Sequence, residues 1–158
     1  MNRKYLALIS RIEEELSDVE RLVERIISAW KLGNQSGDNY YLDSVALNLH
    51  GFYSAIERIF ELIARDIDGT VPDGDSWHHD LLIQMKTEIK KIRPAVISRE
   101  LYQCLDEYRG FRHVVRNVYT FNLSTQRIKP LVESISNTFS KTKEELGEFM
   151  SFIEESAE

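Results

Sequence analysis

Residues 6–30 read LALISRIEEELSDVERLVERIISAW, and this stretch decides the fold class. Its apolar residues recur at steps of three and four, the spacing that places them along one face of an α-helix. Charged residues such as Glu13, Glu14, Glu20 and Glu24 fall between them and form a solvated face. We therefore expect one long amphipathic helix whose apolar stripe packs against other helices.

The same helical period continues through the rest of the chain, and turn-forming residues divide it into further helices. Glycine and aspartate between 33 and 38 predict the first break, and glycine and proline between 66 and 76 predict the second. Ser76 and Ser98 are candidate N-caps of the third and fourth helices. The expected helices are 6–30, 40–67, 76–92, 98–121 and 125–154. These features predict an all-α fold, an antiparallel bundle of about five helices forming a single domain over residues 1–158.

Composition limits the classes of function. The chain has 158 residues, 42% of them apolar and 29% charged, which is typical of a globular protein with a real core. The single cysteine, Cys104, excludes an internal disulfide framework and is expected to fill the core. The sequence has no signal-like or membrane-spanning apolar run, so we expect a cytoplasmic protein. A net charge of −6 argues against general coating of nucleic acid but allows one local basic site.

Such a site is indicated by residues 108–119, which read YRGFRHVVRNVY. From Arg109 to Val132 the chain has no acidic residue, although the whole protein is acidic. At about 100° per residue, Arg109, Arg112 and Arg116 fall on one arc of the helix. His113 and Asn117 fall on a neighbouring arc, and Tyr119 shares the arc of the arginines.

Guanidinium groups at this spacing repel each other, so the row needs a compensating negative charge. One possibility is an anionic ligand, since the arginine fork matches phosphate and carboxylate geometry. The other is neutralisation by glutamates of neighbouring helices. Composition alone favours the second possibility.

The arginine-rich stretch resembles the signature of the HEPN superfamily, specifically its HepT-like members. That signature is an arginine, four to six residues and then a histidine, often followed by another residue and a tyrosine. Arg112 takes the arginine position, Asn117 the histidine position and Tyr119 the tyrosine position. The resemblance extends over roughly residues 5–150 and includes residues 52–60 (FYSAIERIF), 67–72 (IDGTVP) and Trp77-His78.

The resemblance implies a helical homodimer with the motif helices lining a cleft at its interface. It implies the toxin of a type II toxin–antitoxin pair, cutting RNA without a metal and without a cofactor. Arg112 would hold the scissile phosphate, and Arg109 and Arg116 would add phosphate contacts. The partner implied is a minimal nucleotidyltransferase antitoxin, which would transfer AMP to Tyr119.

One residue departs from this pattern. Asn117 cannot exchange a proton near neutral pH, whereas an imidazole can. Either His113, one turn earlier on the same arc, replaces the missing histidine, or the chain is a degenerate member that binds nucleotide or a partner without efficient cleavage. The requirement for accurate positioning of catalytic groups slightly favours the degenerate member. A third possibility, from a different class, is a structural oligomerisation module.

Three residues outside the motif have two interpretations each. Glu57 is a candidate acid of the cleft, although an ion pair with Arg109 or Arg112 is the favoured interpretation. His78 and His79 are adjacent, so their side chains point about 100° apart and do not match the i, i+4 spacing of helical metal ligands. We expect them to pack at the end of a helix.

Overall fold

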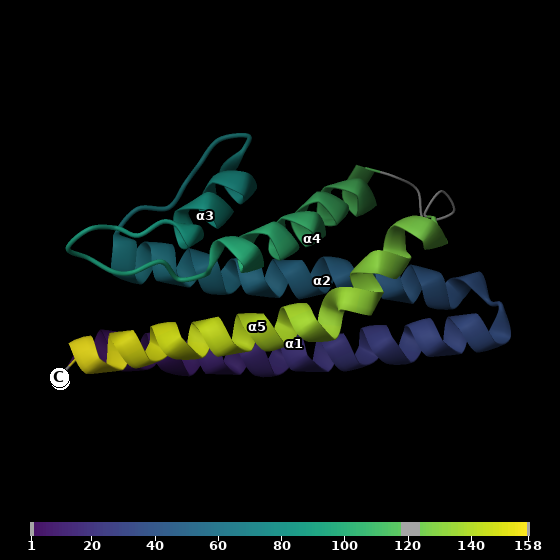
Figure 1. Cartoon of the computed structure of the whole chain (residues 1–158), viewed down its shortest axis with the longest axis horizontal. Helices are drawn as coiled ribbons and strands as arrows, with labels where there is room; N and C mark the ends of the chain where they lie inside the picture. The colour runs from purple at the N-terminus through teal and green to yellow at the C-terminus, as the bar shows by residue number, and fades with distance from the viewer. Residues whose placement is uncertain (1, 118–123, 158) are drawn as a thin grey trace.

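The computed structural model describes residues 2–117 and 124–157. All five α-helices in these ranges pack into a bundle, which confirms the all-α class (Figure 1). No strand is present in the described ranges; Ile89 and Arg93 form one isolated β-bridge. The helices are α1 (Arg3–Ser36), α2 (Asn39–Ile63), α3 (Trp77–Lys86), α4 (Arg99–Asn117) and α5 (Thr125–Ser156), with a π-helical turn, η1 (Ala64–Asp68), directly after α2.

The first two helices form a long antiparallel hairpin. Helix α1 continues into the expected break at 33–38 and ends there at Ser36, with Gly37 as its C-cap. The φ of Gly37 is 70°, the left-handed conformation that glycine adopts without strain. Gly33 is helical, and α2 passes close to it: a Cβ there would lie 3.1 Å from Cβ of Tyr41. The glycine therefore allows close helix approach, where the sequence alone predicted a turn.

Helix α2 is the centre of the bundle. In Figure 1 it lies between α1 on one side and α4 with α3 on the other, while α5 follows α1. Its aromatic residues Phe52, Tyr53 and Phe60 are fully buried. Tyr108 of α4 packs its ring edge-on against Phe52 at 5.1 Å and donates a hydrogen bond of 2.7 Å to the carbonyl of Leu131 in α5. These contacts fix the rotation of α4 about its axis.

The third helix is shorter than expected. It ends at Lys86, and the prediction that it continues to Ile92 is wrong. Residues 87–98 instead fold as a loop around the side chain of Arg93, which is completely buried. The apolar period could not reveal this, because it assigns arginine to the exposed face of a helix, and a fully buried arginine is rare.

Arg93 has an acceptor for each of its five N–H groups. Two face the carboxylate of Asp68 at the end of η1, with Nη2 and Oδ2 separated by 2.8 Å. The other three reach the carbonyl oxygens of Gln84, Thr87 and Pro94 at 2.9 to 3.0 Å. Both charged side chains are fully buried, so this network connects the end of α2 to the loop before α4.

The two expected N-caps have different outcomes. Ser98 caps α4, because its Oγ accepts the backbone N–H of Leu101 at 3.1 Å, and Glu145 of α5 accepts both the Ser98 hydroxyl and its backbone N–H. Ser76 occupies the N-cap position of α3, as predicted, but its side chain makes no cap hydrogen bond. Across the described ranges, no helix is long and apolar enough to cross a membrane.

Candidate functional site

A cleft lies between the start of α3 and the middle of α4. Its volume is about 570 Å³, and its walls carry two guanidiniums and three imidazoles. One carboxylate, that of Asp75, is also present at the cleft, so the wall is not uniformly positive. The lining residues are Asp75, Ser76, His78, His79, Arg109, Arg112 and His113.

The packing of α4 turns Arg112 towards this cleft. Tyr108 and Phe111 are buried in the core, so the residues that follow each of them lie on the flank of the helix. Nε of Arg112 donates a hydrogen bond of 3.0 Å to Oγ of Ser54 in α2. Its Nη1 lies 3.5 Å from both ring nitrogens of His78. The guanidinium is thus oriented by a neutral hydroxyl and placed beside an imidazole.

Behind the cleft, His78 contacts a buried carboxylate. Nδ1 of His78 lies 2.8 Å from Oε2 of Glu57, whose side chain is only 4% exposed. The imidazole ring also stacks on the indole of Trp77, with ring centroids 3.6 Å apart. Glu57 therefore pairs with His78, and the favoured expectation of an ion pair with Arg109 or Arg112 is wrong. His78 faces the cleft and does more than pack at a helix end.

Arg109 has an acidic neighbour on its own helix. Its Nε donates to Oδ1 of Asp106, 2.7 Å away and one turn earlier. The sequence-based expectation considered only glutamates of neighbouring helices. It did not include Asp106, which lies on the same helix just before the acid-free stretch. Arg109 still lines the cleft, but part of its charge is compensated.

The structure describes the remaining residues of the motif to different extents. His113 lines the cleft and is exposed. Arg116 and Asn117 have helical backbones at the end of α4, and their side chains lie outside the description. Tyr119, the expected site of AMP transfer, lies outside the described residues. His79, beside His78, lies 3.3 Å from the hydroxyl of Tyr102.

Two further groups report on the electrostatics behind the cleft. Burial, followed by the charge of Glu57, raises the pKa of the Tyr53 phenol, so this buried hydroxyl stays protonated. Among the described residues it has no hydrogen-bond partner. Partial burial, again followed by Glu57, raises the pKa of Glu61 above its usual range.

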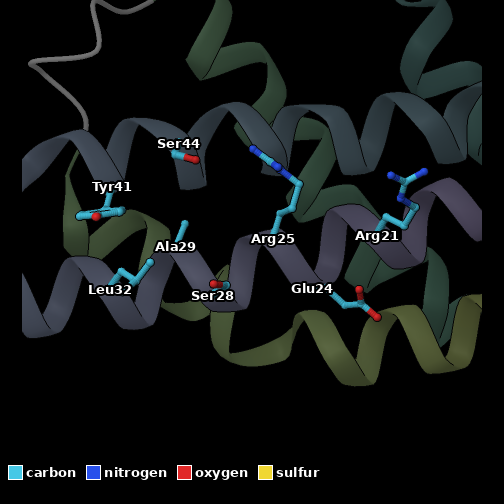
Figure 2. A pocket seen from close by; sticks show the side chains of 8 residues that line it. All are labelled: Arg21, Glu24, Arg25, Ser28, Ala29, Leu32, Tyr41 and Ser44. Carbon is cyan, nitrogen blue, oxygen red and sulfur yellow. The ribbon is translucent and has the colours of Figure 1, made fainter.

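A second hollow, of about 490 Å³, lies on the opposite side of α2, between α1 and α2. Figure 2 shows Arg21, Glu24, Arg25 and Leu32 along α1, with Tyr41 and Ser44 on α2. It combines both signs of charge with apolar surface and contains no histidine. The cleft of α3 and α4 is therefore the better candidate for acid–base chemistry.

Sequence reasoning missed the grouping of Ser54, Glu57 and His78 around Arg112. A usable signal was present: Ser54 and Glu57 are three residues apart, so they share one face of α2. Within the described ranges, no three histidine, cysteine, aspartate or glutamate side chains form a group that could hold a metal ion.

Comparison with known proteins confirms the HepT-like resemblance. A family model described as "HepT-like protein" matches residues 44–153, which include α2 from Ser44, α3, α4 and most of α5. Searches of curated proteins and of solved structures found no match. Because the matched segment covers more than half of the chain, the protein belongs to the HepT-like family.

Proposed function

We propose that this protein is the toxin of a type II toxin–antitoxin pair and that it cuts RNA without a metal in the cleft between α3 and α4. The observation that carries the proposal is the placement of Arg112, whose guanidinium is held by Ser54 next to the imidazole of His78. A guanidinium binds a phosphate through charge-assisted hydrogen bonds, and an adjacent imidazole can move a proton. Histidines and arginines around one cleft suit a phosphodiester ligand.

RNA is the substrate class that suits this set of groups best. Its own 2′-hydroxyl is the nucleophile, so the protein needs only to hold the phosphate and to transfer protons. The resemblance to HepT-like toxins supports the same chemistry, with a minimal nucleotidyltransferase as the cytoplasmic partner. In that pairing Tyr119 would accept AMP from the antitoxin. The modification would place the negatively charged phosphate of AMP near the motif.

Cleavage can be tested directly. Purified protein incubated with bulk RNA in EDTA should shorten it and leave 2′,3′-cyclic phosphate and 5′-hydroxyl ends, because the 2′-oxygen attacks without a metal. Gel electrophoresis and end-group analysis give the readout, and RNA with 2′-O-methyl groups is the matched control. Intact RNA after long incubation at micromolar protein would contradict the proposed activity.

A catalytically silent adaptor is the second candidate, and Asn117 is the observation that favours it. The carboxamide stands where the family motif has histidine, and it does not titrate near neutral pH. In this case wild-type protein would bind a nucleotidyltransferase or nucleotide in the cleft but leave RNA intact. Asn117→His should then produce cleavage that wild type lacks, by at least about 100-fold over background. Cleavage by wild type itself would exclude the adaptor.

Assembly is a separate prediction. We expect a twofold homodimer in which the α4 helices of two chains approach across the cleft, as the HepT-like resemblance implies. A Cβ at Gly110 of α4 would meet nothing within 4 Å in the single chain, so that surface has room for close approach. Light scattering at micromolar concentration should give twice the chain mass of 18.5 kDa. A mass of one chain would contradict the dimer.

A further inference from the structure

Helix α2 supplies two groups that orient residues of other helices at the cleft. Ser54 accepts a hydrogen bond from Arg112 of α4, and Glu57, three residues later on the same face, contacts His78 of α3. α2 is the most deeply packed helix of the bundle, so both groups have a rigid support. Glu57 and His78 are 21 residues apart in sequence, and Arg112 lies 34 residues beyond His78.

The contact with Glu57 decides which nitrogen of His78 can accept a proton. An ionised carboxylate only accepts hydrogen bonds, so Nδ1 of the ring must carry the hydrogen in the 2.8 Å contact. In the neutral ring, Nε2 is then the basic nitrogen. Nη1 of Arg112 lies 3.5 Å from each ring nitrogen, so a phosphate held by this guanidinium would be close to the imidazole.

We propose that His78 is the catalytic base of this cleft and that Glu57 is its positioning residue. This inference rests on the proposed RNA cleavage and names the proton-transfer group for it. It also accounts for Asn117: the chain lacks the motif histidine but has a different imidazole, from α3, beside the motif arginine. His113 on α4 is the competing imidazole, since it also lines the cleft.

The reaction balances without any further reagent. Nε2 of His78 takes the proton of the ribose 2′-hydroxyl while the 2′-oxygen attacks phosphorus. The bond from phosphorus to the 2′-oxygen forms, and the bond to the 5′-oxygen breaks. Water protonates the leaving 5′-oxygen, and the imidazolium returns its proton to solvent. Arg112 holds the non-bridging oxygens, on which negative charge increases during the attack.

A purely structural role for the pair fits the contacts less well. A buried carboxylate requires a hydrogen-bonded partner, and the guanidinium of Arg112 is near enough to His78 to compete for that place. The structure instead gives Arg112 a neutral acceptor in Ser54 and gives Glu57 the imidazole. This arrangement leaves the charge of Arg112 for a ligand and polarises His78, as an orienting carboxylate does in hydrolytic triads.

The test uses the full chain, bulk RNA and EDTA. His78→Gln should lower kcat by at least about 100-fold, the usual contribution of a general base. Glu57→Gln should lower kcat by at least about 10-fold with little change in KM. The variant would no longer orient the His78 imidazole, but Arg112 would still bind the phosphate. His50→Gln and Glu14→Gln are the matched controls, from outside the lining of the cleft, and should stay within about twofold of wild type.

Chemical rescue separates catalysis from folding. His78→Ala should regain cleavage when imidazole is added, whereas damage to the fold would not respond, and circular dichroism should show a helical protein. If His78→Gln cleaves RNA within about threefold of the wild-type rate, this inference alone would be overturned. The same holds if His113→Ala abolishes cleavage and His78→Gln does not. Wild type without cleavage would overturn the proposed ribonuclease, and this inference with it.

Discussion

Replacing Arg93 with alanine should lower the free energy of unfolding by about 3–5 kcal/mol, the usual cost of removing one partner of a buried ion pair. The carboxylate of Asp68 would be left without its cation in a fully buried position. The carbonyl oxygens of Gln84, Thr87 and Pro94 would lose their donors as well. Denaturant unfolding followed by circular dichroism measures the change.

The adjacent ion pair provides a matched control. Arg65 and Asp66 lie in the same π-helical turn as Asp68, with a distance of 3.2 Å, but the Arg65 side chain is 57% exposed. Arg65→Ala should therefore cost less than about 1 kcal/mol. The double change Asp68→Leu with Arg93→Met should remain less stable than wild type, because the three carbonyl oxygens stay without donors. Equal stability of Arg93→Ala and Arg65→Ala would show that burial contributes nothing here.

Arg112→Ala should weaken RNA binding by about 10- to 100-fold, which corresponds to one or two hydrogen bonds to a charged group. The dependence of affinity on salt should also become shallower by about one phosphate contact. Arg112→Lys should recover only part of the loss, because lysine keeps the charge but lacks the planar fork that reaches Ser54. Fluorescence anisotropy with 2′-O-methyl RNA, which cannot be cut, measures binding separately from cleavage.

Arg3→Ala is the control for this prediction. Arg3 is exposed at the first residue of α1, and its replacement by alanine removes the same formal charge from the chain as Arg112→Ala does. It should change the affinity by less than about twofold at moderate salt, since exposed charges act weakly beyond the screening length. Equal losses from Arg3→Ala and Arg112→Ala would mean that the cleft has no special affinity for phosphate.

Local sequence was sufficient for most of the secondary structure. Apolar steps of three and four residues indicate α1, α2, α4 and α5, because a helix repeats every 3.6 residues and each must bury one face. The cap at Ser98 and the positive φ at Gly37 are likewise short-range effects of residue type. The end of α3 was not predictable in this way, because it depends on Asp68, a residue far back in the chain.

The same distinction between local sequence and tertiary packing applies to the site. The sequence by itself determined that Arg109, Arg112 and His113 share one side of a helix and that Asn117 stands at the histidine position of the motif, since these are matters of spacing and residue type. Only the tertiary structure decided that Ser54 and Glu57 of α2 face Arg112 of α4 and His78 of α3. The packing of Tyr108 and Phe52 sets the rotation of α4 against α2, and no local period contains that information. The groups that orient the guanidinium and the imidazole come together because helices far apart in sequence bury their apolar faces against each other.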